Sequence, residues 1–426
     1  MSFELPVDPD ELKAIVKAHP TPFHMYDESM IRNRARELTA AMNQAGVPGF
    51  KNYFAVKALP NPSILKILIS EGMGADCSSV AELAIAEMCG LHGEEIMFTS
   101  NNTLDAEFAY AAKLGAIINF DDITHVDRYL KNIGVPKVMS CRYNPGDISF
   151  DGINESIIGA PHEAKFGMPL DDMLDSYKKM QDAGVSKFGI HTMMLSNERD
   201  YTVHLKIASM LFDAAKQINQ KLGIKFDFIN LGGGIGVAYH PDYSDFDVVA
   251  YANGLTKLYD EMNMVALGEP KIVMENGRYI TAEAGYVVTS VVNRKKTHKT
   301  FVGVDASMSD LMRPGMYSAY HHISVFNKAQ DVDRTEEVDV TGSLCENNDK
   351  FAINRALPIT AIGDILIIHT TGAHGHAMGF QYNGKLRHAE ILLDTKGVAK
   401  LIRRAENLDD YFMTLTEKGV YHVSAN

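Results

Sequence analysis

The sequence predicts an α/β fold, a (β/α)8 barrel of the TIM type followed by an all-β domain. Over roughly the first 280 residues, short apolar runs alternate with amphipathic segments of helical period. The early runs recur about every 20 residues, a spacing that suits strand–helix units in a parallel sheet. Beyond about residue 280, strand-like runs follow one another with turns between them and little helix, which indicates a separate all-β domain.

The length of the chain supports two domains, because 426 residues exceed what one ordinary hydrophobic core holds together. We expect the barrel at residues 29–280 and a β-sandwich or β-barrel domain at residues 281–426. For the N-terminal segment, residues 1–28, two assignments are open, the barrel or the β domain.

Eight apolar runs are the predicted barrel strands. They lie at residues 52–56, 73–77, 96–99, 116–120, 138–143, 188–194, 226–230 and 272–275. Helical segments lie between them at residues 63–71, 80–89, 103–114 and 201–222, among others. Eight units favour a closed barrel over an open doubly wound sheet, which is the alternative topology. The connection at residues 145–187 holds an extra loop of the kind that often serves an active site.

The all-β domain is predicted from six runs separated by turns. They lie at residues 287–292, 300–304, 322–326, 338–342, 364–368 and 389–393.

Composition excludes several classes of partner and location. The formal charge of −13 argues against nucleic acid and against an anionic membrane surface, since both require a basic face. No apolar run is long enough to cross a bilayer, and the N-terminus lacks the character of a signal peptide. The four cysteines are widely spaced with no CxxC pair, so we expect neither a disulfide framework nor a metal site. The expected location is the cytoplasm.

A lysine follows the first predicted strand, where the apolar residues 53–56 end at Lys57. In a barrel, functional side chains lie at the C-terminal ends of the strands. A charge at such a place is costly unless it is paired or used chemically, and a desolvated lysine amine captures carbonyl compounds such as pyridoxal phosphate. The alternative is a lysine that extends from the strand end into solvent.

Later strand ends supply groups that suit a phosphate and a pyridine ring. The glycines of residues 231–236 (LGGGIG) leave backbone amides uncovered, and Arg278 adds a charge-assisted donor after the eighth strand. Glu275 could keep a pyridine nitrogen protonated, and its alternative role is an ion pair with Arg278. Asp76 ends the second predicted strand.

These residues resemble the fold type III pyridoxal-phosphate decarboxylases, which share the alanine racemase-like fold, and within them the diaminopimelate decarboxylases. The resemblance extends over almost the whole chain. Its most specific segments are residues 53–58 (YFAVKA), 232–234 (GGG), 311–317 (LMRPGMY), 342–346 (GSLCE) and 382–384 (YNG). It implies a barrel that binds pyridoxal 5′-phosphate and an obligate homodimer, in which the β domain of a second subunit completes the active site.

The resemblance also implies a role for each matching position. Lys57 would bond to the cofactor, Glu275 would contact the pyridine nitrogen, and Cys345 of the partner subunit would protonate the α-carbon after carbon dioxide leaves. The further cofactor-binding positions that it implies are Asp76, His191, Ser196, Gly233, Gly234, Gly277, Arg278, His374 and Tyr382. The substrate-binding positions that it implies are Arg278, Arg313, Tyr317, Glu346 and His374.

The implied reaction is decarboxylation of meso-2,6-diaminopimelate to L-lysine, the last step of lysine biosynthesis. A thiol with a pKa of about 8.5 suits a proton donor, and the polar residues 346–349 argue against Cys345 as a buried structural cysteine. Glu346 suits the distal ammonium of this substrate, and Arg313 suits its distal carboxylate. The alternative for Arg313 is a surface ion pair with Asp310.

Three segments depart from the family pattern. The run His-x-His-Ile-Gly-Ser appears as residues 191–196 (HTMMLS), so either Met193 replaces the histidine that stacks on the cofactor ring or His191 serves instead. Glu-Pro-Gly-Arg appears as residues 275–278 (ENGR). Gly-Ala-Tyr appears as Gly-Ala-His, so we expect His374 or Tyr382 to replace the missing tyrosine.

Other functions fit parts of the pattern. The first alternative is decarboxylation of another basic amino acid, namely ornithine, D-lysine, D-ornithine or carboxynorspermidine. An amino-acid racemase would need a catalytic tyrosine on the opposite face of the cofactor, for which the sequence offers no clear motif. A regulatory protein with a degraded site would be expected to lack Cys345 or Arg313, and both are present.

Overall fold

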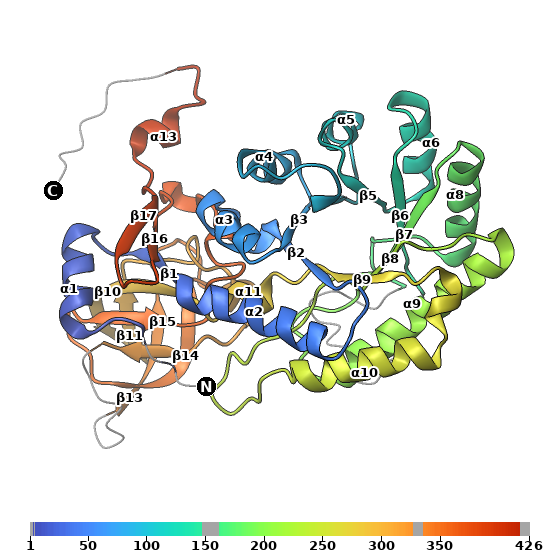
Figure 1. The fold of residues 1–426 in the computed structure, drawn as a ribbon. Coiled ribbons are helices and arrows are strands. Elements are labelled where there is room, and N and C mark those ends of the chain that lie inside the picture. The colour runs from blue at the N-terminus through green and yellow to red at the C-terminus, as the bar shows by residue number, and fades with distance from the viewer. Residues whose placement is uncertain (1–2, 4, 147–161, 327–334, 418–426) are drawn as a thin grey trace. The chain divides into compact units, whose positions relative to one another are not determined.

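Eight parallel strands close into a barrel, which confirms the predicted fold and excludes the open sheet (Figure 1). The computed structural model describes residues 3, 5–146, 162–326 and 335–417, so much of the extra loop predicted after residue 145 lies outside the described residues. β2 pairs with β9 through Lys51 and Val273, which closes the ring. The barrel strands are β2 (Lys51–Ala55), β3 (Gly74–Cys77), β4 (Ile96–Thr99), β5 (Ile117–Phe120), β6 (Val138–Arg142), β7 (Lys187–His191), β8 (Phe228–Asn230) and β9 (Lys271–Met274).

The chain divides into two units. The barrel unit consists of Met1–Ser2, Glu28–Ala284 and Gly372–Ala377. The β unit consists of Phe3–Asp27, Gly285–Thr371 and Met378–Asn426.

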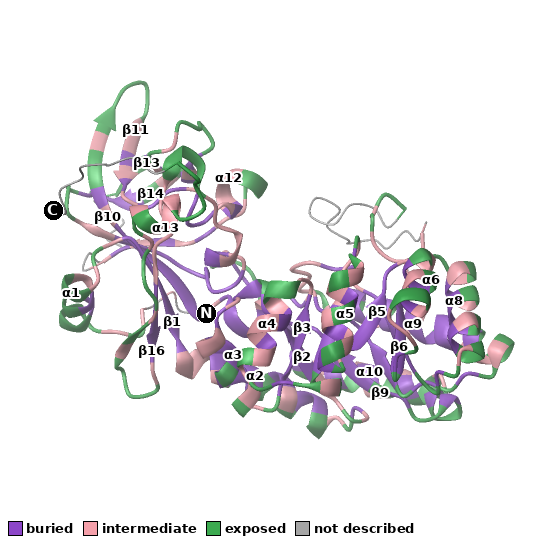
Figure 2. Cartoon of the chain, turned by 90° about the horizontal axis from the view of Figure 1, so that it is seen from above, coloured by how far each residue is buried: buried purple, intermediate pink, exposed green. Residues whose placement is uncertain are grey.

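The helices of the barrel unit begin shortly beyond strand ends, and polar caps fix where they start. The side chains of Asn61, Ser79 and Asp200 each accept a main-chain N–H of the first turn that follows, which satisfies amides that the helix leaves unpaired. Exposed residues gather on the outer faces of the helices, whereas the strands are buried (Figure 2). No helix among the described residues is long and apolar enough to cross a membrane. The helical elements are α2 (Glu28–Gln44), η1 (Val56–Ala58), α3 (Pro62–Ser70), α4 (Val80–Met88), η2 (Gly93–Glu95), α5 (Asp105–Leu114), α6 (Ile123–Asn132), α8 (Leu170–Asp182), α9 (Tyr201–Leu222), α10 (Val248–Glu261), η3 (Met264–Leu267) and α11 (Arg278–Thr281).

The inside of the barrel changes from apolar to polar along the strands. A buried apolar cluster is formed by Tyr53, Met97, Ile117, Val138, Phe228 and Val273. Asn119 lies two residues after Ile117 in β5, and Asn230 lies two residues after Phe228 in β8, so each points to the same side of its strand as the apolar residue before it. The apolar layer thus supports a polar layer at the C-terminal ends of the strands, where barrels carry their active sites.

The β unit is built on one sheet. Its strand order is β14-β13-β11-β10-β1-β16-β17, and β15 pairs with both β10 and β12. β1 comes from the N-terminal segment and lies between β10, antiparallel, and β16, parallel. Six strands match the predicted runs, whereas β1, β14 and β17 had no predicted counterpart. The strands are β1 (Phe23–Asp27), β10 (Gly285–Lys296), β11 (Thr300–Val304), β12 (Ile323–Val325), β13 (Thr335–Thr341), β14 (Lys350–Pro358), β15 (Ile365–Ile368), β16 (Ala389–Leu393) and β17 (Ala399–Arg403).

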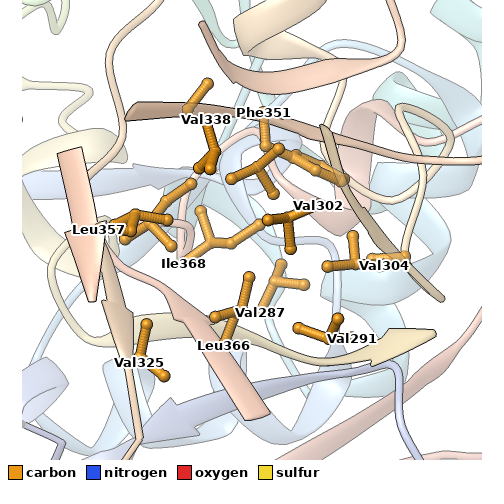
Figure 3. Packing of buried hydrophobic residues seen from close by; sticks show 14 of the residues in the cluster. Val287, Val291, Val302, Val304, Val325, Val338, Phe351, Leu357, Leu366 and Ile368 are labelled. Carbon is orange, nitrogen blue, oxygen red and sulfur yellow. The ribbon is translucent and has the colours of Figure 1, made fainter. Parts of the chain in front are cut away.

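Aliphatic side chains from these strands form the core of the β unit (Figure 3). β10 contributes Val287 and Val291, which meet Val302 and Val304 of β11 and Leu366 of β15 in one cluster. Branched side chains suit such strands because they pack well on a pleated surface. The helical elements are α1 (Pro9–Ala18), α12 (Arg313–Tyr317), η6 (Tyr382–Gly384) and α13 (Leu408–Phe412), and η5 (His376–Met378) joins the two units in the sequence.

Candidate active site

A cavity of about 460 Å³ lies at the C-terminal ends of the barrel strands. Four of the predicted site residues line it, namely Lys57, His191, Ser196 and Glu275. The other lining residues are Ser78, Thr99, Ser100, Asn101, Arg142, Phe166, Met193 and Leu195. The barrel therefore brings together predicted groups that are up to about 220 residues apart in the sequence.

Lys57 lies on η1, the short turn that follows β2, because the strand ends at Ala55. Its side chain is 47% exposed, and Nζ lies 3.7 Å from Oδ2 of Asp76. The prediction of a desolvated lysine at the strand end is wrong in this respect, since the 3₁₀ turn carries the side chain beyond the buried strand. The amine instead faces the cavity beside a buried carboxylate.

Glu275 is buried directly after β9 and contacts three polar side chains, of which Asn119 is the most distant, with its Nδ2 3.5 Å from Oε1. His191 Nε2 lies 3.1 Å from Oε2, and Nδ2 of Asn230 donates to Oε1 at 2.6 Å. Burial alone would raise the pKa of Glu275, but the charge and hydrogen bond of His191, with Lys57 and Asn230, lower it to about 2. Arg278 donates instead to the hydroxyl of Tyr239 at 2.6 Å, so the alternative pairing of Glu275 with Arg278 is wrong.

Asp76, on β3, is the second buried carboxyl group of the cavity region. Burial raises its pKa well above the ordinary value, and the charge of Glu275 raises it further, whereas Lys57 opposes both effects. Oδ1 of Asp76 has no hydrogen-bond partner among the described residues. An ionised Asp76 is therefore unfavourable in the folded protein when no ligand is bound.

Replacing Asp76 with asparagine is expected to stabilise the cofactor-free protein at neutral pH. Because the folded pKa lies above the ordinary 3.8, stability is lost as the pH rises from 3.8 through the folded value, so a penalty is present at pH 7. We expect the variant to unfold about 2 °C higher, which corresponds to about 1 kcal/mol for a unit of this size. Thermal melting at pH 7 and at lower pH tests this, with Asp213→Asn on the exposed face of α9 as the control.

The advantage of Asp76→Asn should shrink as the pH falls toward 4, because the native carboxyl group then takes up its proton. A variant that melts below the wild type at pH 7, or whose advantage does not depend on pH, would contradict the assigned cost of this charge.

The glycine loop after β8 fits a phosphate group. Gly234 adopts φ +100°, and a Cβ there would lie 2.7 Å from the carbonyl oxygen of Leu195, so only glycine is accommodated. The main-chain N–H of Gly234 has no hydrogen-bond partner among the described residues. Gly233 lies against the main chain of Glu275, and Ser196 lines the cavity nearby. The amides of this loop, the amine of Lys57 and the ionised carboxylate of Glu275 are the groups that pyridoxal phosphate requires.

His374, the position that departs from the family tyrosine, lies beside the turn of Lys57. Its main-chain N–H donates to the carbonyl oxygen of Ala58 at 2.9 Å, and its φ is +56°. Gly277 approaches the same alanine, because a Cβ on that glycine would lie 2.7 Å from the Ala58 side chain. The turn of Lys57 is thus enclosed by two further predicted positions.

The β unit gathers four other predicted residues around one turn. Gly315, in the middle of α12, lets the helix approach residues 346–349, since a Cβ there would lie 2.4 Å from the carbonyl oxygen of Asn348. α12 carries the buried Arg313 at its start and the exposed Tyr317 at its end, and the turn beside it carries Cys345 and Glu346. Because Arg313 is buried, the alternative of a surface pair with Asp310 is wrong.

The turn that carries Cys345 is held by side chains from both directions. The carboxylate of Asp349 accepts the N–H groups of Met308 and Leu344, and Oδ1 of Asn383 accepts the N–H of Cys345 at 2.6 Å. The thiol itself is exposed, which agrees with the prediction from its polar neighbours. Tyr382, next to Asn383, is half-exposed.

Sequence reasoning missed three polar residues of the site. Asn119 donates to Thr99 at 2.8 Å, and Asn230 holds Glu275. Arg142 lies 4.5 Å over the ring of Phe166 and donates to the carbonyl oxygen of Met193. Each is a polar residue near the C-terminal end of an otherwise apolar strand, which is the signal that identified Asp76.

Comparisons with known proteins agree with this arrangement. Residues 29–282 match the family model described as "Pyridoxal-dependent decarboxylase, pyridoxal binding domain". The chain is 42% identical over 401 residues to Protein TabA of Pseudomonas amygdali pv. tabaci, covering 94% of this chain and 92% of that protein. It is 34% identical over 391 residues to diaminopimelate decarboxylase of Methanothermobacter thermautotrophicus, covering 92% and 90%. The crystal structure of a diaminopimelate decarboxylase variant from Helicobacter pylori, complexed with L-lysine, matches with a TM-score of 0.85 at 29% identity, covering 94% of this chain and 98% of that chain.

Proposed function

The chain belongs to the pyridoxal-dependent decarboxylases, whose cofactor is pyridoxal 5′-phosphate, and we propose that it converts meso-2,6-diaminopimelate into L-lysine and carbon dioxide. This reaction is the last step of lysine biosynthesis. The relatives that act on diaminopimelate support the proposal, and so does the similarity to a decarboxylase structure that contains L-lysine.

The observation that carries the proposal is a pair of opposite charges on two packed segments, α12 and the turn that carries Cys345. Arg313 begins α12, and Glu346 lies in the turn against which that helix packs. The distal end of diaminopimelate carries one carboxylate and one ammonium, which an arginine and a glutamate complement. A diamine with a single carboxylate offers no distal anion for Arg313 to bind.

Each predicted site residue of the barrel unit has its own role in this proposal. When bound, the cofactor would supply an electron sink for the pair left on the α-carbon as carbon dioxide departs. Lys57 would bind the cofactor covalently, Glu275 would face the pyridine nitrogen as an ionised carboxylate, and the amides around Gly234 would hold the phosphate with Arg278 and Ser196. His191 fixes the carboxylate of Glu275 through the 3.1 Å contact.

Cys345 supplies a proton in the second half of the reaction. We infer that its thiol protonates the α-carbon, since a thiol titrates near the working pH and this one is exposed on a fixed turn. We further infer a homodimer, in which Cys345 of the partner subunit reaches the barrel of the first.

Carbon dioxide release from the purified holoenzyme tests the substrate. Meso-diaminopimelate, L-ornithine, L-lysine and D-lysine are offered separately, and the Lys57→Ala protein serves as the blank. We expect kcat/KM for diaminopimelate to exceed the others by about 10⁴-fold, because the analogues keep the distal ammonium but lack the distal carboxylate that Arg313 would bind. Preferred turnover of any of the other three would overturn the substrate while leaving the decarboxylase in place.

A second candidate is a decarboxylase of another basic amino acid. It is favoured by His374 in place of the family tyrosine, by Met193 in the cavity, and by the 42% identity to Protein TabA, whose name specifies no substrate. Turnover of ornithine or D-lysine in the same assay would support it.

A further inference from the structure

A buried histidine contacts the guanidinium of Arg313. His321 is fully buried, and its Nε2 lies 2.9 Å from Nη1 of Arg313. Its other ring nitrogen, Nδ1, lies 2.9 Å from the main-chain carbonyl oxygen of His369. The imidazole therefore lies between a fixed acceptor and the arginine.

The two neighbours determine the protonation state of His321. A carbonyl oxygen only accepts hydrogen bonds, so Nδ1 must carry the hydrogen. An arginine only donates, so Nε2 must present its lone pair. Only the neutral ring with hydrogen on Nδ1 satisfies both contacts, because the other tautomer and the charged ring would direct an N–H at the guanidinium.

The backbone that carries His321 is also fixed. Arg355, in β14, donates to the carbonyl oxygen of His321 at 3.0 Å and lies 4.1 Å over the ring of Tyr320. The N–H of His369 donates to the carbonyl oxygen of His322 at 2.9 Å, where β12 and β15 pair. His321 itself lies just before β12, on a segment that the hydrogen bonds from Arg355 and His369 hold in place.

We propose that His321 is a positioning residue that sets the direction of the Arg313 guanidinium toward the distal carboxylate of the substrate. The inference rests on the proposed function, because it assigns that carboxylate to Arg313. A guanidinium is a rigid fork, so fixing one of its nitrogens orients the whole plane before substrate arrives. The entropy lost when the Arg313 side chain is ordered is then lost during folding and not during substrate binding. This lowers KM and leaves the chemical step unchanged.

Two matched substitutions separate this role from simple packing. The amide nitrogen of His321→Asn replaces Nδ1, so this variant keeps the bond to His369 and loses the acceptor for Arg313. The amide oxygen of His321→Gln replaces Nε2, so this variant keeps that acceptor. His298→Asn, at the exposed turn between β10 and β11, is the control. KM and kcat for meso-diaminopimelate are measured on each holoenzyme, on Arg313→Ala and on the double variant Arg313→Ala/His321→Asn.

We expect His321→Asn to raise KM about 10-fold with kcat within about twofold, and His321→Gln to remain near the wild type. Arg313→Ala should raise KM more, about 30-fold or beyond, and the double variant should add little to it. The proposal is overturned if His321→Asn leaves KM unchanged or if both histidine variants behave alike. It is also overturned if the KM increases of Arg313→Ala and His321→Asn multiply in the double variant.

Failure of the proposed function would be seen separately, in the wild type. If the wild type prefers an amino acid without a distal carboxylate, the substrate assignment is lost. KM of the same variants is then measured for that amino acid. If Arg313→Ala leaves this KM unchanged, the positioning role is overturned. If Arg313→Ala and His321→Asn both raise it and the double variant raises it no further, His321 still positions Arg313. Thermal melting identifies any variant that merely unfolds, and a loss of folding in both histidine variants also counts against the proposal.

Discussion

Replacing Lys57 with alanine is expected to lower carbon dioxide release by about 1,000-fold or more and to abolish covalent retention of the cofactor. The amine faces the cavity 3.7 Å from Asp76, and no other lysine in the described part of the chain lines that cavity. Borohydride reduction followed by mass spectrometry measures the retention, since it fixes the cofactor to the wild type. Lys66→Ala, on the exposed face of α3, is the control and should behave as the wild type.

The same variant also tests the shared active site. Subunits carrying Lys57→Ala and subunits carrying Cys345→Ala should each be inactive. Mixed in equal amounts after dissociation, they should recover about a quarter of the wild-type activity, because half of the dimers are then mixed and each has one complete site. A Lys57→Ala protein that still fixes the cofactor would refute the role of the lysine, and a mixture that recovers nothing would refute the exchange of Cys345 between subunits.

Replacing Glu275 with glutamine is expected to lower kcat by about 100-fold while the cofactor stays bound. The side chain keeps its size and can still accept from Asn230, but it loses the charge that, in the proposed function, would retain a proton on the pyridine nitrogen. Because the pKa of about 2 lies below the ordinary 4.5, the native carboxylate contributes stability above about pH 4.5 and loses it only as the pH falls through about 2. Glu275 is therefore ionised throughout any practical assay.

Rate, cofactor content and melting temperature are measured together for this variant. Glu261→Gln, on the surface of α10, provides the control. A Glu275→Gln enzyme that keeps its cofactor and turns over within threefold of the wild type would show that the carboxylate has no electronic role.

The sequence was sufficient to predict the barrel because each strand–helix unit repeats the same hydrophobic pattern. Apolar strands and amphipathic helices follow one another, so all eight predicted runs match strands of the closed ring. The β unit was harder to predict, because β14 alternates poorly between buried and exposed residues and most of β17 is exposed. Neither strand shows the period of two that identifies a half-buried strand.

Individual residues of the site were predictable where they follow strands, and their partners were not. Glu275 follows a recognisable strand, but His191, which lowers its pKa, lies 84 residues earlier and is brought to it by the ring of strands. The sequence placed Lys57 directly at the end of the first strand, whereas that strand ends at Ala55 and a 3₁₀ turn carries Lys57 away from the core. Such shifts of one or two residues depend on local backbone geometry, which periodicity does not encode.

The position of β1 has a consequence for how this protein is made. The hydroxyl of Tyr26, in β1, donates to Glu390, which is 364 residues away in the sequence. On the ribosome, β1 emerges first, yet both of its neighbouring strands are synthesised much later. The barrel can close during translation, but β1, which is buried in the folded protein, stays unpaired until β10 has been made about 260 residues later. Until then the new chain is exposed to wrong strand pairing, which a chaperone that shields β1 would prevent.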